Sequence, residues 1–108
     1  METSEQKKII FEEGVTTIPS KRFMDDSMES IIFPSSLTSV EYVAFRGCDG
    51  LTSIILPSNV SLIDRDAFEE CSNLTNIIIK KAKSSLDLSN SGLTQEQIDN
   101  IVWAPEGE

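Results

Sequence analysis

Two consecutive segments of this chain are near copies of each other, and this repetition limits the possible folds more than any other feature. The first copy starts at Ile31 and the second at Ile54, 23 residues later. Nine of the 23 aligned positions are identical, namely two isoleucines and one each of Pro, Ser, Ala, Phe, Cys, Leu and Thr. A repeat of this length with recurring aliphatic positions is typical of a solenoid, in which each unit buries its apolar side by stacking on its neighbours.

A degraded copy precedes this pair. Ile9 aligns with Ile31 at a spacing of 22 residues, and Phe23 aligns with Phe45 at the same spacing. This copy has Glu12 and Asp26 where the regular copies have the proline and the cysteine, and Met28 takes the place of a leucine. Such departures are typical of a terminal unit, which faces solvent on one side.

A fourth copy begins at Ile77 and loses the pattern after Ile79. Lys80-Lys81 replaces Pro-Ser, and the positions of the alanine, phenylalanine and cysteine align with Asn90, Ser91 and Thr94. The sequence therefore predicts about three and a half units within residues 1–79, starting near residues 9, 31, 54 and 77. Residues 80–108 are predicted to hold a degenerate last repeat and a cap.

The motif of the regular copies resembles one known family. It runs Leu51-x-x-Ile54-x-Leu56-Pro57, then Val60-x-x-Ile63, then Ala67-Phe68-x-x-Cys71, and it closely resembles the BspA-like branch of the leucine-rich-repeat family. The resemblance covers roughly residues 9–79. It implies a mostly β leucine-rich-repeat solenoid of short parallel strands in a right-handed coil, to which the sequence adds a C-terminal capping helix. A scaffold family of this kind does not specify what its members bind.

Each unit is expected to begin with a short strand, at residues 8–11, 30–33, 53–56 and 76–79. The resemblance implies that one set of side chains points into the core: Ile31, Phe33, Ile54, Leu56, Ile77 and Ile79. Because side chains alternate along a strand, the intervening positions then point outward: Ile10, Ile32, Ile55 and Ile78. Residues 60–63 are expected to form a second extended segment, followed by a single helical turn at residues 64–68 that places Phe68 in the core.

The sequence from Thr94 onward predicts a helix at residues 94–103. Thr94-Gln95-Glu96-Gln97 is a capping box, and Leu93 is placed to contact Ile98 across it. Ile98, Ile101 and Val102 share one face of such a helix, and Pro105 would end it soon after Trp103. We expect this helix to cover the last repeat, with Trp103 as its anchor; a partner-docking helix is the alternative.

The charge of the chain limits its partners. Asp and Glu number 18 against 9 Lys and Arg, which gives a net charge of −9. This balance argues against direct binding to nucleic acid or to an anionic membrane surface, and favours a protein partner that is basic, if charged. No apolar run approaches membrane-spanning length. The first eight residues do not resemble a secretory signal, so a chain that starts at Met1 is expected in the cytoplasm, although a fragment of a surface protein would look the same.

Little in the sequence indicates catalysis. The chain has no histidine, which removes the commonest general base and the commonest zinc ligand. Cys48 and Cys71 stand one period apart, so a small buried column is expected; a disulfide and a metal site are the alternatives. The acidic turn residues are expected to be solvated charges. The sequence therefore predicts a protein that is not an enzyme and holds no cofactor or metal.

The outward isoleucine column is the first candidate for a binding surface. It would form an apolar ladder about 15 Å long, beside a polar column of Lys8, Ser30, Ser53 and Asn76. The alternative is that β-branched residues occupy these positions because they favour strands.

Three functions follow, and the leading one is a non-catalytic module that binds a protein through the strand face. The second is an acidic inhibitor or decoy that occupies the basic groove of a nucleic-acid-binding protein through Asp64, Asp66, Glu69 and Glu70. The third is a structural repeat fragment that self-associates, giving homo-oligomers through the strand face or the solenoid ends.

Overall fold

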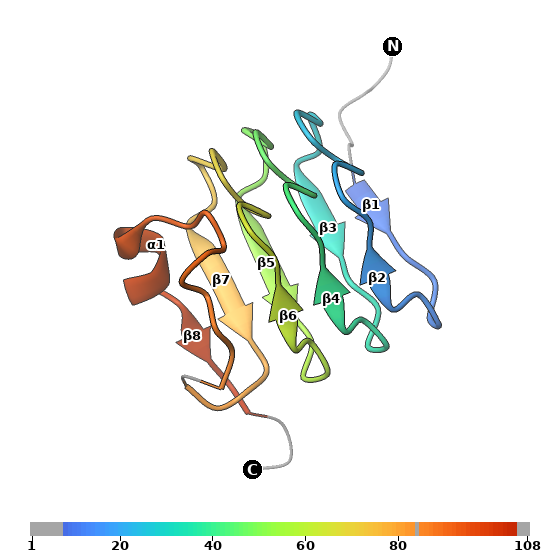
Figure 1. Ribbon diagram of the computed structural model, residues 1–108, viewed down its shortest axis with the longest axis vertical. Helices are drawn as coiled ribbons and strands as arrows, with labels where there is room; N and C mark the ends of the chain where they lie inside the picture. The colour runs from blue at the N-terminus through green and yellow to red at the C-terminus, as the bar shows by residue number, and fades with distance from the viewer. Residues whose placement is uncertain (1–7, 84, 106–108) are drawn as a thin grey trace.

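The protein is a stack of similar turns of chain, and each of the first three contributes one strand to either side of the core. The computed structural model describes residues 8–83 and 85–105. Figure 1 shows the turns following one another from β1 at one end to β8 and the helix α1 at the other. The principal extents are 44 × 30 × 23 Å; the longest is vertical in Figure 1, where the turns follow one another from right to left.

The first side, which we call the strand face, carries the strands that open each turn. These are β1 (Lys8–Ile10), β3 (Ser30–Ile32), β5 (Ser53–Leu56) and β7 (Asn76–Ile79), which confirms the predicted strands to within one residue. All pairings are parallel, and they align equivalent repeat positions: Ile9 with Ile31 and Ile54 with Ile77. The repeats are therefore in register, so that equivalent side chains form columns.

The ladder of the strand face is interrupted once. β3 and β5 lie next to each other, but β1 pairs with β3 in one sheet and β5 with β7 in another. The opposite side of the stack is continuous, because β2 (Thr17–Ile18), β4 (Ser39–Val40) and β6 (Leu62–Ile63) form one parallel sheet. This second sheet confirms the second extended segment expected in each unit.

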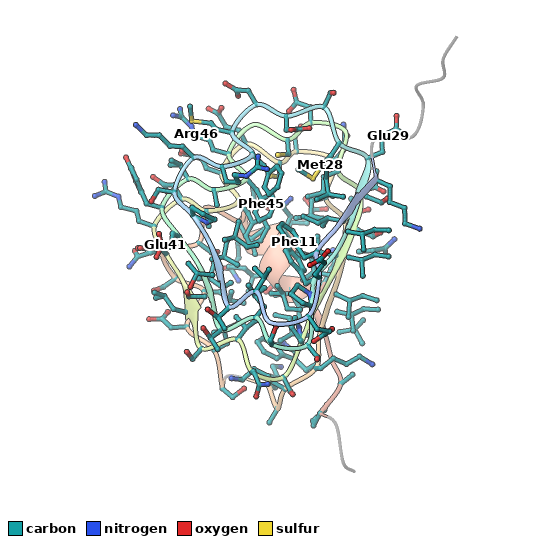
Figure 2. The ribbon with its side chains drawn as sticks, turned by 90° about the vertical axis from the view of Figure 1, so that its right-hand side faces the viewer. Phe11, Met28, Glu29, Glu41, Phe45 and Arg46 are labelled. Atoms are coloured by element: carbon teal, nitrogen blue, oxygen red, sulfur yellow. The ribbon has the colours of Figure 1, made fainter. Side chains whose placement is uncertain are left out.

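Two columns of aromatic rings fill the first half of the core. Phe23, Phe45 and Phe68 stack face to face, with ring centroids 5.4 and 5.3 Å apart. Phe11 and Phe33 stack beside them and meet Phe23 and Phe45 edge-on. Figure 2 looks along the stack and shows Phe11 and Phe45 inside the ring formed by the backbone. Offset-stacked and edge-on contacts are the favourable arrangements of aromatic pairs, so the core gains from geometry as well as burial.

The expected inward positions are inward. Ile31, Ile54, Leu56, Ile77 and Ile79 are at most 6% exposed. Phe33 is half-buried and packs against the same core.

The corner after the second sheet differs from the expected helical turn at residues 64–68. Asp66 has a φ of 55°, in the left-handed region, as does Val43 one repeat earlier with 49°. The backbone there forms a run of tight turns whose N–H groups bond to the next unit: Phe45 N donates to Ala67 O at 2.8 Å. Stacking satisfies these donors, so a helix is not needed. Phe68 is nevertheless buried, as expected, with 1% exposure.

The C-terminal region contains a short helix and an additional strand in place of the predicted helix at 94–103. Helix α1 runs over Gln95–Asp99, and β8 (Val102–Trp103) follows it and pairs in parallel with β7. The prediction was wrong for Val102 and Trp103: they stand opposite Ile78 and Ile79 in the sheet. The helix ends at Asn100, before Pro105 is reached, because the strand ladder takes over the backbone.

The predicted capping box is present and does more than start α1. Thr94 Oγ1 accepts from Gln97 N at 3.1 Å, and Gln97 Oε1 accepts from Thr94 N at 2.8 Å. Gln97 Nε2 also donates to Cys71 O and Leu74 O, at 2.8 and 2.9 Å. The same side chain therefore caps the helix and donates hydrogen bonds that satisfy two carbonyl groups of the preceding turn.

The last turn is shifted by one residue from the expected alignment. Phe68 N donates to Ser91 O at 2.8 Å, as Phe45 N does to Ala67 O, so Ser91 stands over Ala67 and Gly92 stands over Phe68. Ser91 is fully buried, and its hydroxyl donates to Leu88 O at 2.7 Å. Gly92 has a φ of 86°, and a Cβ there would lie 2.6 Å from Glu69 N. The phenylalanine column therefore ends where two backbone segments meet.

Candidate functional site

The outward column of the strand face is exposed and longer than predicted. Ile10, Ile32 and Ile55 are 65%, 47% and 51% exposed, whereas Ile78 is half-buried. Strand β8 adds Val102, which is 56% exposed and stands opposite Ile78. Five branched aliphatic side chains therefore follow one another across the strand face.

Sequence reasoning missed Val102, although a signal was present. The run Ile98-Asp99-Asn100-Ile101-Val102-Trp103 matches Leu74-Thr75-Asn76-Ile77-Ile78-Ile79 at a spacing of 24 residues. The capping box, which lies immediately before this run, obscured the match by favouring a helix over the same residues. The run is the start of a further repeat, and its strand is β8.

A polar column lies beside the aliphatic one, as expected. Lys8 pairs in register with Ser30, and Ser53 with Asn76. Lys8, Ser53 and Asn76 are exposed and Ser30 is half-buried. The strand face therefore offers hydroxyl, amide and ammonium groups next to branched aliphatic surface.

A groove of about 530 Å³ opens on the strand face where the ladder between β3 and β5 is interrupted. Its floor includes the two columns, with Ser30, Ile32, Ser53 and Ile55, and its lining also includes Phe33 from the core. Outer side chains complete it at the two ends of the strands: Lys8, Glu13, Ser35, Pro57 and Lys80. The structure thus gathers four of the seven predicted strand-face residues around one groove, while Ile10, Ile78 and Asn76 lie outside its lining.

One carboxylate of this groove is held by the neighbouring turn. Glu13 Oε1 accepts from Ser35 Oγ at 2.7 Å, and Glu13 Oε2 accepts from Ser35 N at 3.1 Å. The hydroxyl bond and then the backbone bond hold the pKa of Glu13 below its ordinary value, because both favour the ionised form. Glu13 is therefore an ionised group, and each of its oxygens accepts one bond from Ser35.

The acidic residues Asp64, Asp66, Glu69 and Glu70 lie in the turns on another side of the molecule, and most of them have a basic neighbour. Arg46 Nε lies 3.2 Å from Glu69 Oε1 and Arg46 Nη2 lies 3.7 Å from Glu70 Oε2. Figure 2 shows Arg46 at the corner away from the strands of the strand face. Arg65 Nε is 3.8 Å from Asp66 Oδ2, and Asp64 Oδ1 accepts from Arg65 N at 2.6 Å. The surface is one of mixed charge.

The two cysteines are buried free thiols on adjacent turns. Cys48 Sγ donates to Phe23 O at 3.1 Å and Cys71 Sγ donates to Phe45 O at 3.0 Å. The neighbouring Cys71 thiol, and then burial, raise the pKa of Cys48, which keeps it protonated and unreactive. Within residues 8–83 and 85–105, no three His, Cys, Asp or Glu side chains are grouped to hold a metal ion. The predicted buried column is present, and its two sulfurs are not bonded to each other.

The stacked parallel strands, the periodic aliphatic positions and the exposed strand face define a leucine-rich-repeat solenoid. Within that class, the chain belongs to the family described as a BspA-type leucine-rich-repeat region of six copies, whose model matches residues 1–102. The division into residues 1–79 and 80–108 stays a prediction.

A solved structure supports the assignment. The chain is 32% identical to a leucine-rich cell surface protein from Faecalibacterium prausnitzii A2-165, with a TM-score of 0.66. The similarity covers 77% of this chain and 22% of that one, so this chain spans under a quarter of that protein's length. No curated protein matched the sequence. In the part of the chain that the structure describes, no helix has the length and apolar character to cross a bilayer.

Members of this family typically have no catalytic activity, and leucine-rich repeats generally mediate protein–protein interaction. The columns of the strand face therefore have to be judged as a binding surface.

Proposed function

We propose that this chain is a non-catalytic interaction module that binds another protein through its strand face. The supporting observation is the row of exposed aliphatic side chains on this face, in which Ile10, Ile32, Ile55 and Val102 are 47% to 65% exposed. Branched aliphatic side chains exposed in a continuous row are typical of surfaces that a partner covers. The sheet beneath them is held by the packed core, so little ordering is needed on binding.

The polar column lies beside the aliphatic row, and this supports the use of the strand face as a binding surface. Interfaces combine an apolar centre with a polar rim that fixes orientation. Ser53 and Asn76 stand one position before the buried isoleucines Ile54 and Ile77, so their side chains lie on the same side as Ile55 and Ile78 at the next outward position. A partner strand or loop that covered the aliphatic row would meet these groups.

The test compares two pairs of substitutions. Ile32→Asp with Ile55→Asp should abolish capture of a partner by the immobilised protein, because it places two charges in the centre of the strand face. Tyr42→Asp with Leu62→Asp is the matched control, since these side chains are 45% and 47% exposed away from the strand face. Captured proteins would be identified by mass spectrometry, and circular dichroism and melting temperature should stay close to wild type in both variants.

A partner that the Ile32→Asp, Ile55→Asp variant still captures as well as wild type would refute the proposal. The acidic-decoy alternative predicts instead that binding falls steeply with salt and depends on Asp64, Asp66, Glu69 and Glu70. The ion pairs of Arg46 and Arg65 with these side chains weigh against it. Self-association predicts particle mass that rises with concentration in light scattering.

The proposal holds in either compartment that the sequence leaves open. The same surface would serve inside the cell or, as part of a longer surface protein, outside it. The module itself needs neither cofactor nor metal for binding.

A further inference from the structure

The groove on the strand face carries a charge pattern opposite to that of the whole chain. Lys8 lies at one end of it and Lys80 at the other, while Glu13 is the acidic side chain of its lining. The oxygens of Glu13 are bonded to Ser35. Between described residues, neither lysine ammonium lies within 4.0 Å of a carboxylate. The lining therefore carries two ammonium groups and one carboxylate, a net charge of +1.

The two lysines stand at diagonally opposite corners. Lys8 is in the first turn and shares a row with Ser30, Ser53 and Asn76 of the next three turns. Lys80 is in the fourth turn, four positions after Asn76. Three strand spacings of about 4.8 Å and four positions of about 3.3 Å give a diagonal of roughly 20 Å. An extended peptide covers that distance with about six residues.

The surface between the lysines is apolar at its centre. Ile32 and Ile55 project from it, and the hydroxyls of Ser30 and Ser53 lie beside them. A peptide that crosses the groove would therefore place apolar side chains over the isoleucines and its own polar backbone near the serines. Its ends would reach the two ammonium groups.

The net charge of −9 does not decide this local preference. The carboxylates of Glu69 and Glu70 lie with Arg46 at the far corner in Figure 2, and the molecule is 23 to 30 Å across its two short axes. Screening by salt reduces interactions beyond a Debye length of about 8 Å at physiological ionic strength. The nearby lysines therefore outweigh Glu69 and Glu70 for a bound ligand, and these two carboxylates mainly slow its approach.

We propose that the groove binds an extended segment of a protein partner with an apolar centre and an acidic residue at each end, about six residues apart, one facing Lys8 and the other facing Lys80. This inference rests on the proposed function and specifies the chemistry of its ligand. It also departs from the basic partner that the net charge predicts.

The test uses three blocked seven-residue peptides with the same Thr-Val-Thr-Val-Thr centre and with Glu, Gln or Lys at both ends. The two end residues are six positions apart and lie on the same face of an extended chain as the valines. Binding is followed by NMR titration of the amide signals of the full chain. The Glu peptide should bind tightest and perturb Ser30, Ile32 and Ser53, with an advantage of about tenfold over the Gln peptide from two exposed ion pairs. Added salt should reduce this advantage.

Charge reversal separates the lysines of the groove from other lysines. Lys8→Glu with Lys80→Glu should invert the order, so that the Lys peptide binds tightest. Lys83→Glu is the control, because Lys83 is exposed and lies outside the groove, and it should leave the order unchanged.

The inference would be overturned if the three peptides bound equally to wild type, or if the Glu peptide showed no saturable binding. It would also be overturned if Lys8→Glu with Lys80→Glu left the order of affinities unchanged. The proposed function would survive these outcomes if Ile32→Asp with Ile55→Asp still abolished capture of a protein partner. The proposed function would be refuted, independently of the peptide results, if this variant still captured the partner.

Discussion

The middle turns, residues 31–79, and the C-terminal region, residues 80–105, continue the same stack by different means. In the middle turns, identical side chains lie over each other, as with Phe45 and Phe68 at 5.3 Å. In the C-terminal region, Gly92 replaces the phenylalanine, and a helix with a polar side chain, Gln97, closes the preceding turn. The backbone bonds between turns are kept in both. Stacking therefore requires the backbone geometry of the repeat, whereas the side chains that fill and close it can change.

The largest expected effect comes from the aromatic column of the middle turns. Phe68→Ala should lower the free energy of unfolding by about 3–5 kcal/mol, because it removes a side chain that is 1% exposed and leaves a cavity. Phe11→Ala, at the half-buried end of the second column, is the matched control and should cost less. Urea denaturation followed by circular dichroism measures both. Equal losses would show that the middle turns are no more dependent on stacking than the terminal one.

Gly92→Ala should have the next largest effect and tests the contact that replaces the column. The added Cβ would lie 2.6 and 2.8 Å from the backbone N and Cα of Glu69 at a φ of 86°, so we expect a loss of about 2–3 kcal/mol. Gly14→Ala provides the comparison, since its φ is 102° but no heavy atom lies within 4 Å of the added Cβ. It should cost about 1 kcal/mol from backbone strain alone. A loss at Gly92 no greater than at Gly14 would contradict the close approach.

Gln97→Ala should loosen the C-terminal region selectively. It removes the bonds to Cys71 O, Leu74 O and Thr94 N, and the expected cost is about 1–3 kcal/mol. Trp103, the single tryptophan, lies in β8 and reports on this region, so its fluorescence should change at lower urea than the circular dichroism signal. Gln95→Ala loses only an exposed bond to Asp99 and should keep the two transitions together. Coincident transitions in Gln97→Ala would place α1 within the same cooperative unit as the middle turns.

The smallest expected effect is on the pH dependence of stability. It compares a hydrogen bond between turns, from Ser35 to Glu13, with one inside a turn, from Ser89 to Asp87. Ser35→Ala should raise the pKa of Glu13 toward its ordinary value of 4.5, because the largest cause of its lowering is the Ser35 hydroxyl. A lowered pKa in the folded state stabilises above the unfolded pKa, and this stabilisation is lost as pH falls below about 4.5 and through the folded value. Stability should therefore depend less on pH in the Ser35→Ala variant over that acidic range.

Ser89→Ala is the control for this titration. The pKa of Asp87 is lowered from its ordinary 3.8 by bonds first from the Ser89 backbone and then from its hydroxyl, all within one turn. Carboxyl NMR titration should show each substitution acting on its own carboxylate. A shift of Glu13 in the Ser89→Ala variant would indicate that the two regions are coupled.

The sequence was sufficient for the regular part of the fold. Strict repetition fixes which positions stack, so the strands followed from aligning Ile31 with Ile54. The inward isoleucines followed from the family resemblance, and the outward column from the alternation of side chains along each strand. The tight turns at residues 64–68 did not follow, because Val43 and Asp66 adopt positive φ without a glycine to indicate it. The stacking bonds of neighbouring turns stabilise that geometry, and they are not visible in the local sequence.

The candidate site was predictable in part for the same reason. The aliphatic column follows from the period, but Val102 was hidden because a strong local helix signal competed with a six-residue repeat match at a spacing of 24 residues. The groove was not predictable at all. The spacing between β3 and β5 equals the spacing between β5 and β7, so nothing in the repeat length indicates where the ladder is interrupted.

That interruption has a mechanical consequence. The β2-β4-β6 sheet runs unbroken past it, whereas on the strand face no ladder bonds join β3 to β5. Flexing the stack at this level therefore pivots about the continuous side and changes the separation of two strands without breaking a hydrogen-bonded ladder. We therefore expect the stack to bend most easily at the level of its groove, and a ligand wedged between Ile32 and Ile55 to set the angle between the two halves.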